Sequence, residues 1–412
     1  MLQPTNDRTH ALRHVNRGGV LLLAGSMLAA APAFAQDASK STMDLYGFIM
    51  LDTGYQVNQN DPDWFDVVRP TKLPSFENEF GADGNWFFSV RQTRFGLKTS
   101  TPTELGDLKT QFEFELFGTG SDAGQTTFRL RHAYGELGQF GAGQTVSPFM
   151  DIDIFPNSIE YWGPTGMVFF RNVQVRWMPI QGDTRLTVAL ERPGASGDQG
   201  EYADRVELSG ITPHFPYPDV SAEYRLARDW GYVEVAGIVR WIELEDNLPD
   251  AFDFSAEEVG WGINVTSNVN LGKTVLRVGV VYGEGVQNYM NDAPADVGPR
   301  NNFGDPRRPV VAEVLPLLGV SAFVDINWSE KMTSTVGYSL LDIDNSDGQT
   351  ADAFKHGDYA LANVLFYPVK NVMFGPEIQW GRRENARDGF SSDDVRFQFS
   401  VKYNFGRTFG GN

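Results

Sequence analysis

The sequence predicts an all-β fold, a transmembrane antiparallel β-barrel of about 16 strands, and three observations lead to this prediction. Apolar and polar residues alternate along segments that recur from one end of the chain to the other. The connections between these segments alternate between tight turns and long loops. No apolar stretch after residue 36 is long enough to cross a bilayer as a helix, so a helical membrane protein is excluded.

The first 35 residues have the pattern of a signal peptide. Arg8, Arg13 and Arg17 precede an apolar run over 20–31, and the segment ends in Ala33-Phe34-Ala35. The run is too short for a membrane anchor. We therefore expect export and cleavage. The expected division is a signal peptide over 1–35, a short tether over 36–41, a barrel over 42–405 and a C-terminal tail over 406–412.

Composition limits the possible functions. Removing residues 1–35 changes the formal net charge from −19 to −21 and leaves 377 residues, so a nucleic-acid role is not expected. The chain has no cysteine and only five histidines, which argues against a disulfide framework and a structural zinc site. We expect no cofactor and no metal.

The alternation with a period of two is cleanest at the end of the chain. Over 395–405 one face is wholly apolar and the other polar, and the same division recurs over 108–116 and 276–282. The strands expected from this pattern are 42–55, 86–99, 107–118, 126–137, 140–147, 171–178, 184–192, 218–226, 231–242, 258–268, 273–284, 317–328, 331–341, 358–367, 371–382 and 393–405.

The connections between successive strands are of two kinds, short turns and long loops. Tight turns such as Gly138-Gln139 alternate strictly with the long loops 56–85, 148–170, 193–217, 285–316 and 342–357. Outer-membrane barrels have short periplasmic turns and long outer loops. A soluble β-sandwich is the alternative, but it need not keep this alternation. Aromatic residues near strand ends are expected to form interfacial girdles: Tyr46, Trp86, Trp177, Trp241, Trp261, Trp328, Tyr367 and Trp380.

Several short patterns, in this order and spacing, resemble the DcaP-like trimeric porins of Gram-negative outer membranes. They are Asp44-Leu45-Tyr46-Gly47, Arg94-Phe95-Gly96-Leu97-Lys98, Arg129-Leu130-Arg131-His132-Ala133-Tyr134, Gly143-Gln144-Thr145 through Met150-Asp151, Trp261-Gly262, Tyr282-Gly283-Glu284-Gly285, Asn363 with Tyr367-Pro368, and Lys402-Tyr403-Asn404-Phe405.

The resemblance covers most of the mature chain and implies a trimeric, sixteen-stranded channel for small anions such as dicarboxylates. It also implies outer-membrane lipid, lipopolysaccharide and the barrel assembly machinery as partners. The sequence departs from the family in two ways. It lacks the helical coiled-coil extension that some members carry before the barrel, and it continues past Phe405.

Strand parity assigns a lumen face, because the apolar face must meet lipid. The basic residues on the lumen face are Arg94, Lys98, Lys109, Arg129, Arg131, Arg176, Arg240, Arg277, Arg396 and Lys402. The acidic residues there are Glu113, Glu115, Glu191, Glu234 and Glu377. Most negative charge then lies in the outer loops, where it stays solvated or binds divalent cations, at Asp61, Asp63, Asp66, Glu243, Glu245, Asp246, Asp292, Asp296, Asp342 and Asp344.

The segment over 148–170 is expected to fold inward and narrow the pore. Arg94, Arg129, Arg131 and Arg176 are the best candidates for a constriction that attracts carboxylates, because a guanidinium group offers a fixed fork of donors. Alternatively, these arginines pair with carboxylates and hold the loop in place. The basic set of the constriction is completed by Lys109 and Arg171, and its acidic face is expected to contain Asp151, Asp153, Glu160, Glu113 and Glu115.

One polar residue fits the lipid face poorly. His132 shares the parity of Phe128 and Leu130, so we expect it at a subunit interface or near the bilayer edge.

Three functions are compatible with such a barrel. The favoured one is passive diffusion of small anions. The second is a general or sugar-selective porin, with aromatic side chains that guide sugar rings: Trp64, Phe65, Tyr161, Trp162, Phe169 and Phe170. The third, an outer-membrane phospholipase or protease, is disfavoured because the chain has no Gly-x-Ser-x-Gly, His-Glu-x-x-His or Walker-type motif.

Overall fold

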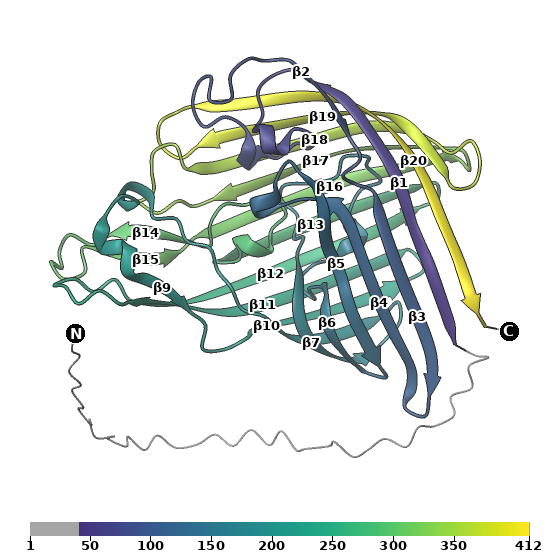
Figure 1. The fold of residues 1–412 in the computed structure, drawn as a ribbon, viewed down its shortest axis with the longest axis horizontal. Helices are drawn as coiled ribbons and strands as arrows, with labels where there is room; N and C mark the ends of the chain where they lie inside the picture. Colours follow the sequence, from purple (N-terminus) through teal and green to yellow (C-terminus); the bar gives the residue numbers. More distant parts are fainter. Residues whose placement is uncertain (1–40, 412) are drawn as a thin grey trace, which may run out of the picture. The chain divides into compact units, whose positions relative to one another are not determined.

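The computed structural model describes residues 41–411, so the signal peptide over 1–35 and most of the expected tether lie outside the described residues. The strands form one large antiparallel sheet that closes on itself through β1 and β20 (Figure 1). Its strands are β1 (Thr42–Gln56), β2 (Asn85–Ser89), β3 (Arg94–Thr103), β4 (Gly106–Phe117), β5 (Thr126–Leu137), β6 (Phe140–Val146), β7 (Arg171–Ile180), β8 (Arg185–Glu191), β9 (Ile211–His214), β10 (Asp219–Arg228), β11 (Gly231–Asp246), β12 (Ala256–Leu271), β13 (Thr274–Glu284), β16 (Pro316–Ser329), β17 (Met332–Ile343), β18 (Phe354–Phe366), β19 (Val372–Asn385) and β20 (Ser391–Gly410).

These strands occupy 16 positions in the wall, which confirms the predicted barrel. Two positions are interrupted: β2 and β3 both pair with β1, and β9 and β10 both pair with β11. The first interruption, at residues 90–93, was not expected. Consecutive side chains Arg91 and Gln92 are both buried there, and Arg91 forms an ion pair with Asp66 at 2.6 Å. Two neighbouring residues of a regular strand cannot both point to the same face.

The remaining elements lie in the loops. A two-stranded hairpin is formed by β14 (Val297–Asn301) and β15 (Val310–Val314). Short 3-10 helices are η2 (Pro62–Trp64), η3 (Pro70–Lys72), η4 (Gly120–Asp122), η5 (Ile152–Ile154), η6 (Gly200–Tyr202), η7 (Val206–Gly210) and η8 (Gln287–Tyr289). Among the described residues, no helix is long and apolar enough to cross a membrane.

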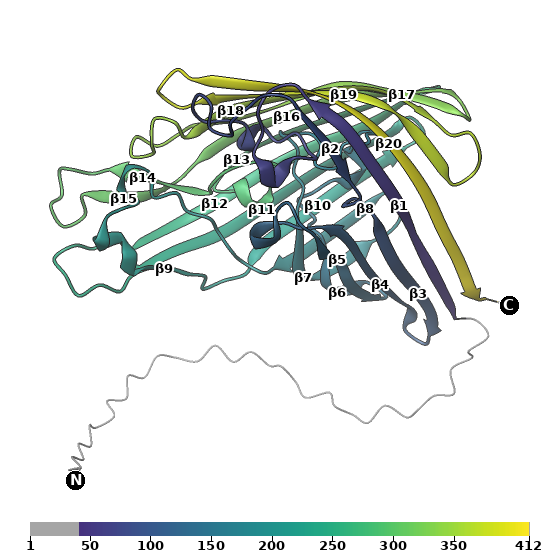
Figure 2. The same ribbon diagram turned by 45° about the horizontal axis from the view of Figure 1, so that its top comes forward.

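The long loops gather at one end of the barrel and the tight turns at the other, which we call the loop end and the turn end (Figure 1). Figure 2 shows β1 and β20 running side by side toward the turn end. The strand β20 continues through Gly410 and pairs with β1 as far as Thr42. Residues 406–410, which we expected in a tail, therefore extend the wall, because the β1 ladder continues beside them.

The outer face of the barrel is apolar, as the alternation predicts. Phe397, Val235 and Ile263 are each about half exposed on it. Of the expected girdle residues, Trp86, Trp177 and Trp328 are also exposed, but Tyr46 and Tyr367 hydrogen-bond to interior groups. Polar side chains line the interior, and the loop over 148–170 lies within it.

Candidate functional site

The loop over 148–170 leaves β6 and contacts the interior side chains of many wall strands. The side chain of Asn264 on β12 donates a hydrogen bond to the Phe149 carbonyl. Farther along, the amides of Ile159 and Glu160 donate to the Glu377 carboxylate on β19 at 3.0 and 3.1 Å. On its return, the Gly166 amide donates to the Ser339 hydroxyl on β17. The loop thus lies within the barrel, held by hydrogen bonds from several sides.

The first two acids of this loop bind an arginine that the sequence analysis missed. Asp151 and Asp153 accept hydrogen bonds from Arg225 on β10, at 2.6 and 2.5 Å. Asp151 is 1% exposed and also accepts from Tyr232 and Thr266. The alternation of Tyr224, Arg225 and Leu226 could have placed Arg225 in the lumen, but its partners lie 74 and 72 residues away in sequence.

The third acid of the loop, Glu160, is fully buried. Its carboxylate accepts hydrogen bonds from the amides of Val68 and Gly163, and Arg396 on β20 lies 3.5 Å away. Burial raises the pKa of Glu160 to about 7, although the Arg396 guanidinium opposes the rise. Asp151, Asp153 and Glu160 therefore face basic residues of the wall. Arg396 was expected on the lumen face but not at the constriction, and Arg225 was not expected there at all.

The other two predicted acids lie on β4 and collect three arginines. Arg131 on β5 binds Glu113 at 2.6 Å and Glu115 at 2.8 Å. Arg94 on β3 lies 3.1 Å from Glu115, and Arg129 lies 3.7 Å from the same carboxylate. We call these five residues the eyelet cluster. Three guanidinium groups against two carboxylates leave one formal positive charge.

The members of the eyelet cluster differ in exposure. The side chain of Arg131 is 7% exposed, whereas those of Arg94 and Arg129 are 24% and 27% exposed. The loop over 148–170 contacts the cluster through Tyr161, whose hydroxyl donates a hydrogen bond to Glu115. Arg131 is thus committed to the two glutamates, while Arg94 and Arg129 remain accessible.

The other predicted basic residues lie outside this cluster. Lys109 pairs with Glu136 at 3.4 Å near the turn end. Arg176 donates to the Gln174 side chain and to the Val146 carbonyl. Arg171 lies over the Phe169 ring at 4.9 Å. None of these three residues forms an ion pair with a member of the cluster among the described residues.

A β-bulge overturns the expectation for His132. The register between β4 and β5 shifts between Glu113 and Phe114, opposite Arg131. The extra residue reverses the parity, so Arg131 and His132 both face inward. His132 is 9% exposed, and its Nδ1 lies 2.9 Å from the Thr145 hydroxyl. It is therefore an interior residue and does not lie at the lipid face.

A cavity of about 450 Å³ lies beside the eyelet cluster, lined by Arg129 and by five of the six aromatic residues proposed to guide sugars. Three of these rings are already covered by neighbouring side chains. Tyr161 stacks on Phe117 at 3.9 Å, and the Arg69 guanidinium lies 4.1 Å from the rings of both Trp64 and Trp162. Arg69 is itself paired with Asp292. The cavity therefore combines one eyelet arginine with aromatic side chains, three of which are already covered.

Three acids expected in solvated loops are instead buried and paired. Asp66 binds Arg91, Asp292 binds Arg69 and Asp296 binds Arg240, at 2.6 to 2.9 Å. These pairs fix the loops to the wall.

The sequence of this barrel was compared with models of known protein families. Residues 30–225 match the family model described as DcaP outer membrane protein. The chain is similar to this family over these residues, which make up just under half of its length. Its location is therefore the outer membrane, as the sequence predicts. No curated protein matches the chain.

Solved structures share the fold of this chain. The outer membrane channel DcaP of Acinetobacter baumannii is 21% identical, covers 90% of this chain and 99% of its own, and gives a TM-score of 0.74. The trimer form of OmpT, an outer membrane protein of Vibrio cholerae, is 11% identical, with coverages of 89% and 100% and a TM-score of 0.54. An anion-selective porin from Comamonas acidovorans is 10% identical, with coverages of 89% and 100% and a TM-score of 0.53. These likenesses establish the porin fold.

Proposed function

We propose that this porin allows the passive diffusion of small anionic solutes of the dicarboxylate type. The observation that carries the proposal is the charge of the eyelet cluster, in which three arginines outnumber two glutamates. Arg94 and Arg129 are the accessible members. A guanidinium group binds a carboxylate through two parallel hydrogen bonds, and walls of low dielectric constant strengthen the attraction.

The positions of the loop acids support the same proposal. Asp151 and Glu160 are buried and hydrogen-bonded, so their charges are compensated away from the cluster. Asp153 is the exception, since its side chain is 49% exposed even though it pairs with Arg225. Constriction by the loop over 148–170 then leaves a passage whose accessible charges are mainly basic.

Two lysines extend the basic surface toward the turn end. Lys402 on β20 lies 4.1 Å from the Phe48 ring, which Arg94 also covers at 5.2 Å. Lys98 on β3 lies 5.3 Å from the Tyr46 ring. Neither lysine has a carboxylate within 4.0 Å in the part of the chain that the structure describes. An anion that leaves Arg94 therefore meets further positive charge.

The solved relatives agree with two finer parts of the proposal. One of them bears the description anion-selective porin, and another is a trimer form. We accordingly propose a homotrimer in contact with outer-membrane lipid and lipopolysaccharide, inserted by the barrel assembly machinery. The sugar-selective alternative is less favoured, because several of the aromatic rings that it requires are covered: Tyr161 by Phe117, and Trp64 and Trp162 by Arg69.

Liposome swelling tests the proposal. Vesicles that contain the wild-type protein should admit succinate faster than a neutral sugar of similar mass. Arg94→Ala combined with Arg129→Ala should slow succinate several-fold and leave the sugar rate unchanged. Arg382→Ala, which removes an exposed arginine paired with Glu384, is the matched control. Faster entry of the sugar than of succinate, or no effect of the double variant, would contradict the proposal.

A further inference from the structure

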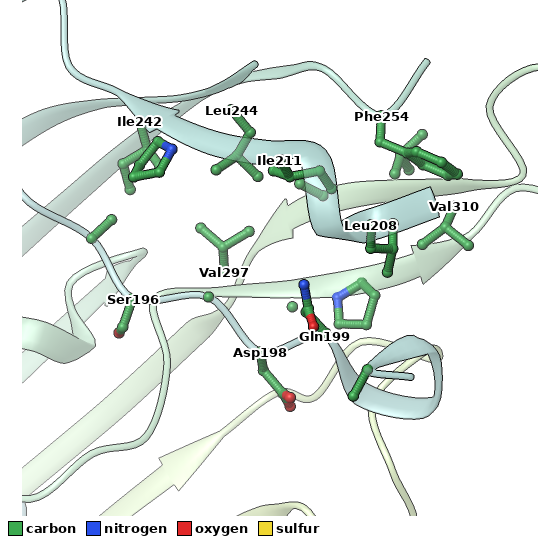
Figure 3. Close-up of a pocket in the computed structure, with 18 residues that line it drawn as sticks. Ser196, Asp198, Gln199, Leu208, Ile211, Ile242, Leu244, Phe254, Val297 and Val310 are labelled. Carbon is green, nitrogen blue, oxygen red and sulfur yellow. The ribbon is translucent and has the colours of Figure 1, made fainter. Parts of the chain in front are cut away.

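An apolar cavity of about 420 Å³ lies among the loops at the loop end of the barrel (Figure 3). One wall belongs to β11, where Ile242 and Leu244 have the parity of the buried Arg240 and therefore face the inside of the barrel. The opposite wall is one face of the β14–β15 hairpin, on which Pro299 and Ala312 stand opposite each other in the register. Two apolar surfaces thus face each other across the cavity.

The cavity lies between two clusters of buried apolar side chains. The members of these clusters are Ile242, Val297 and Val314, and Leu208, Phe254 and Val310. Small residues also line the cavity, among them Ala195, Gly197 and Ala312. A Cβ placed on Gly197 would meet no atom of a non-adjacent residue within 4 Å, so the space beside Gly197 is open. Protein interiors contain few voids larger than a water molecule, whereas a volume of this size is typical of ligand pockets.

The charge and the hydroxyl group at the edge of this cavity already have partners. Among the described residues, Asp198 is the only charged residue that lines it. The Asp198 carboxylate points away from the cavity in Figure 3 and accepts hydrogen bonds from the Gly200 amide and the Gln349 side chain, both at 2.9 Å. The Ser196 hydroxyl donates to Asn288 at 2.8 Å. A charged ligand would therefore lose its hydration without gaining a counter-charge.

One polar side chain is left for a ligand. Gln199 lies at the edge of the cavity (Figure 3), and its side-chain amide has no hydrogen-bond partner within residues 41–411. This amide offers both an acceptor and donors. A buried water molecule needs about two to four polar partners, so the mainly apolar space holds water poorly. An apolar body that fills the space gains dispersion contacts that the empty cavity lacks.

We propose that this cavity binds a small neutral molecule with an apolar body and a single hydroxyl or carbonyl group. The apolar body packs between Leu244 and Val310, and the polar group forms a hydrogen bond with the Gln199 amide. Because the ligand contacts both walls, it links the β14–β15 hairpin to β11. The site does not depend on the proposed anion passage, since none of its lining residues belongs to the eyelet cluster.

Three probes with one apolar body and different charges test this site. They are 1-adamantanol, 1-adamantylammonium and adamantane-1-carboxylate, titrated calorimetrically into the full-length protein in nanodiscs, with empty nanodiscs as the blank. The alcohol should bind at least about tenfold more tightly than either charged probe, because the cavity offers no counter-charge. The bound alcohol should also slow amide hydrogen exchange over 297–314, because it links the hairpin to the wall.

Filling the cavity provides the second arm of the experiment. Gly197→Phe places a ring in the open space, so the folded variant should lose binding of the alcohol. The matched control is Gly304→Phe, which should bind as the wild type does, because Gly304 has equally open surroundings but does not line the cavity. Gln199→Leu should weaken binding of the alcohol several-fold, since it removes the hydrogen bond.

Four results would overturn the proposal. They are absence of alcohol binding by the wild type, equal or tighter binding of a charged probe, full binding by folded Gly197→Phe, and unchanged exchange over 297–314 in the alcohol complex. Full binding of the alcohol by Gln199→Leu would overturn the assignment of its hydrogen-bonding partner.

Discussion

Removal of Arg225 should release the first part of the loop over 148–170. Its guanidinium group binds Asp151, Asp153 and Glu234 at 2.5 to 2.7 Å and is 7% exposed. Breaking a buried ion pair by removing one partner costs about 3–5 kcal/mol, because the other charge stays buried without compensation. The loop can avoid that cost by detaching, so that Asp151 becomes hydrated.

The free-energy cost of losing these ion pairs determines how much faster the loop amides should exchange. At 1.4 kcal/mol per factor of ten, a cost of about 3–5 kcal/mol corresponds to faster amide exchange by between roughly 100-fold and 5,000-fold. Hydrogen–deuterium exchange with mass spectrometry on peptides spanning 148–157 measures it in Arg225→Ala. The control is Arg382→Ala, which breaks a pair whose side chains are 41% and 39% exposed. Exposed pairs contribute at most about 1 kcal/mol, so exchange should rise by no more than about fivefold. Unchanged exchange in folded Arg225→Ala would refute the reasoning.

Three further substitutions have defined outcomes. The pKa of Glu160 is raised to about 7 in the folded protein, above its ordinary value. The protonated Glu160 side chain therefore stabilises the fold fully at low pH, and this contribution is lost as pH rises through about 7. The thermal midpoint of the wild type should therefore fall relative to that of Glu160→Gln between about pH 5 and pH 8; parallel curves would exclude this role. His132→Phe should lower the free energy of unfolding in urea by about 1–3 kcal/mol, because Thr145 loses its buried partner; a stabilised variant would place the ring at the lipid face instead. A Cβ at Gly166 would lie 2.7 Å from the Val320 amide nitrogen, so Gly166→Ala should displace the loop and raise single-channel conductance; unchanged conductance would mean that the loop does not narrow the passage.

The strands of the barrel wall could be predicted from the sequence, because contact with lipid requires every second residue of a strand to be apolar. Each strand must present alternate apolar residues, and the segment over 395–405 does so without exception. The strand prediction fails where two consecutive side chains both have polar partners inside the barrel. Arg91 and Gln92 both turn inward and interrupt a strand, since Asp66 and Asp52 supply buried partners for their side chains.

The candidate site was less predictable, because it depends on register and on distant pairs. A single bulge opposite Glu113 and Phe114 is enough to move His132 from the expected outer face to the interior. Parity could place Arg94, Arg129 and Arg131 in the lumen, but it could not reveal that Arg131 lies closest to both glutamates and is the most buried of the three. The partner of Asp151 lies on β10 and is found only when the loop is traced through the interior.

The central claim is that the accessible eyelet arginines give the passage its preference for anions, and the reversal potential across a potassium chloride gradient tests it most directly. Planar bilayers would be measured with the wild type and with Arg94→Ala combined with Arg129→Ala, leaving Arg131 to hold Glu113 and Glu115. We expect a reversal potential of the sign that indicates chloride selectivity in the wild type, and a shift toward cation selectivity in the variant. A cation-selective wild type, or a reversal potential unchanged by the two substitutions, would contradict the account.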